Sequence, residues 1–142
     1  MKTKIAQMEI SAAAKNGNLF IDRTSGKTIF ASQQQLLEIS LHAADLSVPT
    51  RNFKTVKTWT YLLFEEFFIQ GDLEKEKNLP VSFLCDRETT NVAKNQPGFS
   101  NFIVIPLFTH LTELMPNLKP MLTQCKANTE LWTHYSESEE DK

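Results

Sequence analysis

The pattern of apolar and polar positions predicts a first helix between Gln33 and Ala44. Apolar residues recur there at intervals of three and four, the spacing that places side chains on one face of a helix. They are Leu36, Leu37, Leu41 and Ala44. Pro49 follows, and a proline disfavours helical geometry in the residue before it. We therefore expect one helix that ends before a proline turn.

The stretch from Phe53 to Gln70 carries a wider apolar face at the same spacing. Its central stripe consists of Val56, Trp59, Leu63 and Phe67, and Leu62, Phe64 and Phe68 widen it. So wide a face predicts a deeply buried helix. Gly71 follows, and because glycine commonly ends a helix, we expect the helix to stop there.

Two further helices are predicted in the last third of the chain. The first carries Phe99, Phe102, Ile103, Leu107, Leu111 and Leu114 at near-helical intervals. Pro106 lies inside this run and removes a backbone donor, which predicts a kink between Phe102 and Pro106. The second helix carries Leu118, Met121, Leu122, Cys125 and Trp132 on one face.

No strand pattern competes with these helices, so we expect an all-α, multi-helix fold. The stretch from Lys4 to Lys15 is compatible with another helix, whereas residues 16–30 carry turn residues and mixed signals. The acidic end, residues 136–142 (SESEEDK), has the composition of a disordered tail.

Composition narrows the class of protein. A chain of 142 residues, 41% of them hydrophobic, is the size of one domain or part of one. Its net charge of -2 argues against a nucleic-acid partner. The apolar runs are too short to span a membrane, and no signal-peptide core follows Met1, so we expect a soluble, cytoplasmic protein. Cys85 and Cys125 are expected to be buried or idle thiols.

Residue spacing alone gives only weak evidence for a functional site. His42 and Asp45 stand three residues apart and face one side of the first helix, but two ligands do not make a zinc site. Spacing favours Asp45 as a residue that ends the helix before the proline turn. By the same reasoning Gln96 is a loop or helix-start residue and Phe99 a core residue. The acidic residues Glu65, Glu66, Asp72 and Glu74 are typical of a solvated helix end.

Three stretches in order change this interpretation: HAADLSVPTR, TWTYLLFEEFFIQGDLEKE and LPVSFLCDRETTNVAKNQPGFSNFIVIPLF. Together they resemble the C-terminal part of the catalytic domain of class I 3',5'-cyclic nucleotide phosphodiesterases. The resemblance is clearest over residues 36–132, within a partial domain at residues 1–135. It implies an all-helical, HD-type domain that hydrolyses cAMP or cGMP to the 5'-monophosphate. It also implies a pocket with two metal ions, Zn²⁺ and Mg²⁺ or Mn²⁺.

The resemblance also implies roles for individual residues. Asp45 matches the last zinc-ligating aspartate, whereas His42 matches no ligand and returns to a structural role. Gln96 matches the glutamine that hydrogen-bonds the purine, and Phe99 matches the aromatic residue that stacks on it. Leu63 matches the aliphatic residue on the opposite side of the base. Val48 stands near the base, where the family commonly has a polar residue such as asparagine.

The chain departs from the family pattern in what it lacks. The other three metal ligands and the general-acid histidine belong to motifs that precede this part of the domain, so no catalytic residue is expected here. Two interpretations therefore remain open. The chain is either the C-terminal part of a working enzyme or a truncated, non-catalytic relative that acts as an interaction or decoy module. In both cases apolar faces would be exposed, which predicts contact with the missing N-terminal part or with a protein partner.

Pro97 is a local departure from the family pattern. A proline pushes the preceding residue away from helical geometry, so we expect Gln96 outside the helix. A helix that begins at Pro97 as its first residue would still let the amide of Gln96 reach the base.

Overall fold

The computed structural model describes residues 20–21, 28–30 and 33–135. Within these ranges the predicted all-α class is confirmed, with one small addition, two short antiparallel strands. The strands are β1 (Phe20–Ile21) and β2 (Thr28–Phe30). The helices are α2 (Gln33–Asp45), α3 (Phe53–Glu76), α4 (Val92–Phe99), α5 (Ile105–Leu114) and α6 (Lys119–His134). The predicted helix at residues 4–15 and the acidic tail lie outside the described residues.

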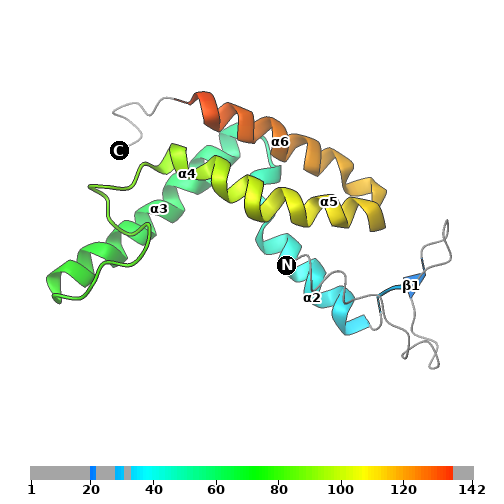
Figure 1. The fold of residues 1–142 in the computed structure, drawn as a ribbon, viewed down its shortest axis with the longest axis horizontal. Helices are drawn as coiled ribbons and strands as arrows, with labels where there is room; N and C mark the ends of the chain where they lie inside the picture. Colours follow the sequence, from blue (N-terminus) through cyan, green and yellow to red (C-terminus); the bar gives the residue numbers. More distant parts are fainter. Residues whose placement is uncertain (1–19, 22–27, 31–32, 136–142) are drawn as a thin grey trace.

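The helices form an arch (Figure 1). Helices α4 and α5 follow one another along its top and α6 packs against both, while α3 and α2 descend on opposite sides. The larger hydrophobic core joins α2, α5 and α6, because the apolar faces of these helices converge there. Its buried members are Ile39, Ala43, Val104, Leu107, Phe108, Leu111 and Cys125.

A smaller core attaches the start of α3 to α4 and α6. Val56, Ala93 and Trp132 are its buried members. The ring of Phe53 stands edge-on to that of Trp132 with centroids 5.1 Å apart, a favourable arrangement of aromatic rings. Only the first turns of α3 are anchored by this core, so the rest of the helix extends away from it (Figure 1).

The start of α4 differs from the sequence prediction. Asn91 caps the helix by accepting a hydrogen bond from the Lys94 amide at 2.8 Å, so the helix begins at Val92. Gln96 is therefore inside α4, and Pro97 is an interior residue, not the first one. The prediction that Gln96 lies outside the helix is therefore wrong, because the cap at Asn91 starts the helix before the proline.

The predicted irregularity before Pro106 takes the form of a wide helical turn. Residues Ser100–Val104 form a π-helical segment (η3) that joins α4 to α5, and Pro106 lies in the first turn of α5. A proline has no amide hydrogen and crowds the preceding turn. The wider π turn accommodates this interruption without separating the two helices.

Two predictions for α3 are wrong. The helix does not stop at Gly71 but continues to Glu76, and Gly71 is buried inside it. The helix is also not deeply buried: its fully buried residues are Val56, Thr60, Phe64 and Gly71, while Trp59 is 57% exposed and Leu62 59%. Within the described ranges, no helix has the length and apolar character needed to cross a membrane.

Candidate functional site

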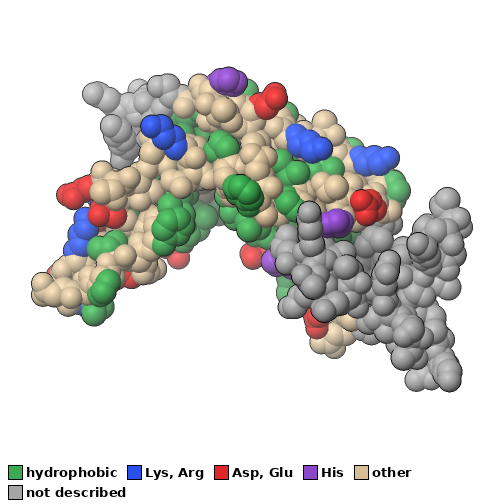
Figure 2. Space-filling model, in the orientation of Figure 1, with side chains coloured by type: hydrophobic (Ala, Val, Ile, Leu, Met, Phe, Trp, Pro, Cys, Tyr) green, Lys and Arg blue, Asp and Glu red, His purple; other side chains and the backbone are tan. Residues whose placement is uncertain are grey.

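A groove of about 780 Å³ lies under the arch between α3, α4 and two connecting segments. One segment is the turn that follows α2 and contains a short 3-10 helix, η2 (Val48–Thr50). The other is the loop at residues 77–91 that joins α3 to α4. Figure 2 shows hydrophobic side chains along the inner edge of the arch, and the residues around the groove are mostly apolar.

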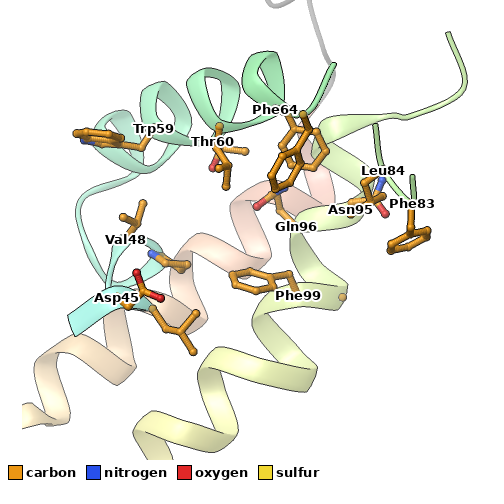
Figure 3. Close-up of a pocket in the computed structure, with 15 residues that line it drawn as sticks. Asp45, Val48, Trp59, Thr60, Phe64, Phe83, Leu84, Asn95, Gln96 and Phe99 are labelled. Carbon is orange, nitrogen blue, oxygen red and sulfur yellow. The ribbon is translucent and has the colours of Figure 1, made fainter. Parts of the chain in front are cut away.

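All five residues that the resemblance marked line this one groove. They are Asp45, Val48, Leu63, Gln96 and Phe99. Figure 3 shows Asp45 and Val48 at one side, with Gln96 and Phe99 extending from α4. His42 is exposed on α2 and does not line the groove.

Gln96 is held in a defined orientation by its helix. Its side chain is only 8% exposed, and its Nε2 donates a hydrogen bond to the carbonyl of Val92, one turn earlier, at 3.2 Å. A planar amide fixed in this way presents a donor and acceptor pair in one plane. Asn95, which also lines the groove, is held in the same way, because its Nδ2 donates to the carbonyl of Asn91 at 2.7 Å. The groove therefore has two oriented amide side chains in a largely apolar lining.

Leu63 and Phe99 are the partly open apolar residues beside that amide. Leu63 on α3 is 48% exposed and Phe99 on α4 is 40% exposed, although both are large hydrophobic side chains. Because they line the same groove from different helices, their exposed surfaces face a space that a flat, apolar ring could fill.

Sequence reasoning missed the wall that the 77–91 loop contributes. Phe83 and Leu84 line the groove, as do Trp59 and Thr60 one turn before Leu63 on α3. The spacing to Leu63 could have revealed Trp59 and Thr60. Nothing periodic marks the loop residues, because their position depends on contacts with α3.

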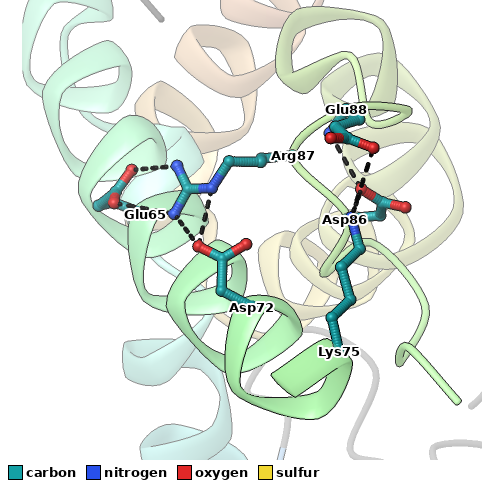
Figure 4. Close-up of polar contacts among 6 residues, drawn as sticks. All are labelled: Glu65, Asp72, Lys75, Asp86, Arg87 and Glu88. Carbon is teal, nitrogen blue, oxygen red and sulfur yellow. Dashed lines mark hydrogen bonds and ion pairs between the residues drawn. The ribbon is translucent and has the colours of Figure 1, made fainter. Parts of the chain in front are cut away.

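Charged side chains hold this loop against α3 (Figure 4). The guanidinium of Arg87 donates to Asp72 at 2.7 Å and to Glu65 at 3.3 Å, and it lies over the ring of Phe68. Lys75 donates to Asp86 at 2.8 Å. We call these ion pairs the loop tether. The acidic residues predicted to form a solvated helix end are thus partly engaged in fixing a loop.

The tether lowers the pKa of its carboxyl groups. The hydrogen bond from Arg87 holds the pKa of Asp72 below its usual value, and the hydrogen bond from Lys75 does the same for Asp86. The pKa of Glu74 is lowered because it accepts hydrogen bonds from the backbone and side chain of Ser82. In return, Asp86 raises the pKa of Lys75. These groups are therefore ionised at neutral pH, where Asp72 and Asp86 form ion pairs and Glu74 accepts hydrogen bonds from Ser82.

The loop crosses α3 at Gly71. A side-chain carbon at that position would collide with the backbone carbonyl of Cys85, so only glycine permits this approach. Burial raises the pKa of both Cys85 and Cys125, which keeps these thiols protonated and confirms the prediction that they are buried.

Leu84 has an unusual backbone conformation for its residue type. Its φ of 66° lies in the left-handed region, and the amide of Cys85 donates to the carbonyl of Ser82 at 3.0 Å, closing a tight turn. Such a turn normally uses glycine at this position. The contacts of the loop with α3 hold Leu84 in this conformation, which places it in the groove wall.

Among the described residues that line the groove, Asp45 is the one carboxylate, and it is exposed at the end of α2. Among the described residues, no three His, Cys, Asp or Glu side chains gather closely enough to hold a metal ion. Zinc in proteins takes about four ligands. The described part of the chain therefore does not contain a complete metal site.

Known proteins resemble the chain in sequence. The sequence model of the 3'5'-cyclic nucleotide phosphodiesterase family matches residues 2–125. A calcium/calmodulin-dependent dual specificity 3',5'-cyclic nucleotide phosphodiesterase 1B of Mus musculus is 48% identical over 96 residues, which is 62% of this chain. A 3',5'-cyclic-AMP phosphodiesterase of Drosophila melanogaster, isoform F, is 35% identical over 126 residues, or 88% of the chain. The chain spans 18% of the length of each of these relatives.

A solved structure resembles the fold as well. The phosphodiesterase domain of a Salpingoeca rosetta rhodopsin phosphodiesterase superimposes with a TM-score of 0.70 at 31% identity. The match covers 94% of this chain and 39% of that domain chain. The likeness thus extends over nearly all of this chain but over less than half of the known domain.

Proposed function

Because this chain belongs to the 3',5'-cyclic nucleotide phosphodiesterase family, a metal-dependent family, we propose that its groove binds the base of cAMP or cGMP. The complete protein would hydrolyse the cyclic nucleotide to the 5'-monophosphate. One observation carries the proposal: Gln96, Phe99, Leu63, Val48 and Asp45, which come from four separate segments, line a single groove.

The chemistry of the lining suits a purine. Phe99 supplies an aromatic face for stacking, a contact worth about 1–3 kcal/mol per base, and Leu63 covers the other face. The amide of Gln96 supplies hydrogen bonds to the base edge, and its bond to Val92 limits its rotation. Val48 adds an apolar wall in place of a polar contact.

We further propose that Asp45 contributes one carboxylate oxygen to a Zn²⁺ and Mg²⁺ or Mn²⁺ site whose other ligands lie beyond the described residues. Such ions, when bound, polarise a phosphate and lower the pKa of a bound water. Asp45 suits this role because it is exposed at the end of α2, on the side of the groove occupied by Val48. With Asp45 in this role, the phosphate would lie beyond the Val48 turn and the base between α3 and α4.

Calorimetric titration of cAMP and cGMP into the 142-residue chain tests base binding. The Phe99→Ala and Gln96→Ala variants are expected to weaken affinity about tenfold each, the size of one lost stacking or amide contact. Phe102→Ala is the matched control, because Phe102 is an aromatic residue three positions away that is 80% exposed and does not line the groove. Equal losses in all three variants would contradict the proposed base site.

A second candidate function is a non-catalytic interaction module. It is favoured by the incomplete ligand set among the described residues and by the exposed apolar side chains of α3, such as Trp59 and Leu62. Elemental analysis and a cAMP and cGMP hydrolysis assay on the purified chain test the second candidate: stoichiometric zinc with turnover would exclude it. Because neither zinc nor turnover is expected of an isolated part of the domain either, the same assays on the complete protein distinguish the two candidates, and turnover is expected there only of a working phosphodiesterase.

A further inference from the structure

Asn128 is a buried polar residue on α6, far along the sequence from the groove residues. Its side chain is 1% exposed. Its Nδ2 donates two hydrogen bonds, to the carbonyl of Pro49 at 2.8 Å and to the carbonyl of Arg51 at 2.7 Å. These carbonyls lie 79 and 77 positions earlier in the chain, so the amide ties two distant segments together.

The segment that Asn128 holds is the turn after α2. The turn is closed locally by the Arg51 amide, which donates to the carbonyl of Val48 at 3.0 Å, and by the Thr50 hydroxyl, which donates to the carbonyl of Ser47 at 2.6 Å. These bonds give the turn its shape, but they do not fix its place relative to other helices. The bonds from Asn128 do so, because they reach it from α6.

The orientation of the Asn128 amide is itself determined. The Nε2 of Gln124, one turn earlier on α6, donates to Asn128 Oδ1 at 3.0 Å. Because the oxygen is engaged there, both amide hydrogens point to the two carbonyls of the turn. An aspartate at this position would present oxygen to those carbonyls, with no hydrogen to share.

Helix α6 is also the support of α4, which carries Gln96 and Phe99. The same helix therefore locates both sides of the groove: α4 through packing, and the turn with Val48 and Pro49 through the Asn128 amide. Asp45 ends the helix that leads into this turn.

We infer that Asn128 is a positioning residue for the nucleotide site: it holds Val48, and with it the end of α2 at Asp45, at the correct distance from the base-binding residues of α4. The part of this inference that concerns nucleotide binding rests on the proposed function. The part that concerns the attachment of the turn to α6 can be tested separately. Asn128 lines no part of the groove and acts only through the turn.

The experiment compares the wild-type chain with Asn128→Asp and with Thr129→Val as the matched control. Thr129 is a neighbouring buried polar residue of α6 whose hydroxyl donates only within the helix, to the carbonyl of Cys125 at 2.8 Å. Hydrogen exchange of the Thr50 and Arg51 amides is the local readout, because these amides close the turn. Asn128→Asp is expected to accelerate both at least tenfold relative to the middle of α3 and α6, and Thr129→Val is not.

Titration with cAMP and with cGMP supplies the functional readout, where Asn128→Asp is expected to raise the Kd about tenfold and Thr129→Val to leave it unchanged. Unchanged exchange at Thr50 and Arg51 in Asn128→Asp would overturn the inference, as would acceleration spread evenly over all helices. A wild-type chain that binds neither nucleotide would refute the proposed function, while the exchange result would still decide whether Asn128 holds the turn.

If Asn128→Asp does not fold, the side-chain amide hydrogens of Asn128 in the wild-type chain decide the matter. Bonded as described, they are expected to exchange with water at least tenfold more slowly than those of an exposed asparagine such as Asn101. Exchange at the same rate as Asn101 would overturn the inference.

Discussion

The turn that follows α2 and the loop that follows α3 both form walls of the groove, but different interactions attach them to the protein. The turn is held by the Asn128 amide, which is buried and uncharged. The loop is held by ion pairs such as that between Arg87 and Asp72, whose side chains are 37% and 49% exposed (Figure 4). The side chain that attaches the turn is thus buried and uncharged, whereas those that attach the loop are exposed and charged.

The two walls are therefore expected to respond to different conditions. Salt screens exposed ion pairs and low pH neutralises their carboxylates, whereas neither acts on a buried neutral amide. We expect the turn wall, near the proposed metal and base contacts, to keep its position under these conditions. The loop wall with Phe83 and Leu84 is the side of the groove that we expect to respond to salt and pH.

The largest expected effect is on the turn wall. Asn128→Leu has a similar size but removes both donors, so the part-buried carbonyls of Pro49 and Arg51 lose these bonds. A polar group that loses its partner costs roughly 1–3 kcal/mol, according to how far it is shielded from water, so the free energy of unfolding should fall by about 3 kcal/mol in a urea titration. The control Thr129→Val loses one helical side-chain bond and should cost about 1 kcal/mol. Equal losses would show that Asn128 adds nothing specific to the turn.

Gly71→Ala tests the loop wall at the point where the loop crosses α3. The new methyl group would collide with the backbone of Cys85, and a backbone cannot rotate aside. Overpacking typically costs about 1–3 kcal/mol, so we expect a loss of about 2 kcal/mol in unfolding free energy despite the better helix propensity of alanine.

Gly98→Ala is the control for that substitution. Nothing lies within 4 Å of the added carbon, so the gain in helix propensity of up to about 1 kcal/mol should appear unopposed. If both alanine variants were equally stable, the loop would not approach α3 as closely as described.

Arg87→Gln tests the charged part of the loop tether. The variant removes the ion pairs with Asp72 and Glu65, and because they are exposed, global stability should change little. Hydrogen exchange of the Cys85 and Thr90 amides, both bonded within the loop, should accelerate a few-fold.

The same acceleration should appear in the wild-type protein at about 1 M salt, where the Debye length is only about 3 Å. Lys126→Gln on α6 removes one positive charge elsewhere and should leave the loop amides unchanged. A wild-type loop insensitive to salt would contradict the role of the ion pairs.

The smallest effect is the pH dependence of the loop tether. The pKa values of Asp72, Glu74 and Asp86 are lowered in the folded protein, so the unfolded state takes up protons first as the pH falls. Their stabilisation is present above the ordinary carboxyl pKa values of 3.8 and 4.5 and is lost as the pH falls through the lower folded values.

Protection factors of the loop amides are therefore expected to decrease below about pH 4. Those of Thr50 and Arg51 should hold until the whole protein unfolds, because Asn128 does not titrate. The pKa of Lys75 is raised, so its contribution is present below 10.5 and disappears only as the pH rises through the folded value. Simultaneous loss of both walls in acid would contradict the comparison.

Most of the helices could be predicted because periodicity is a local signal. The helix from Gln33 and the last helix follow their apolar spacing, and the resemblance identified residues that the fold brings into one groove. Periodicity reports an apolar face but not what covers it. For that reason the wide face of α3 was expected to be buried, although Trp59 and Leu62 are exposed.

The features that sequence reasoning missed depend on contacts between distant segments. A glycine such as Gly71 looks the same in the sequence whether it ends a helix or makes room for a passing loop. The close approach of the Cys85 backbone, which only the fold shows, identifies the second role. In the sequence nothing distinguishes Asn128 from other helical asparagines, and only the fold shows that its amide binds the turn after α2. In contrast, the start of α4 could be predicted from the sequence, because asparagine at position 91 is a strong N-cap residue.

The π-helical turn at Ser100–Val104 sets how insertions and deletions would be tolerated in this chain. Each residue of an α-helix advances the side-chain direction by about 100°, so the extra residue that a π turn holds rotates every later side chain relative to the earlier ones. This rotation lets Gln96 face the groove while Leu107 and Leu111 face the core. Deleting a single residue from Ser100–Val104 would restore a regular helix and turn the core face of α5 away from α6. A change in the length of the irregular turn would therefore disturb the packing of α5 on α6.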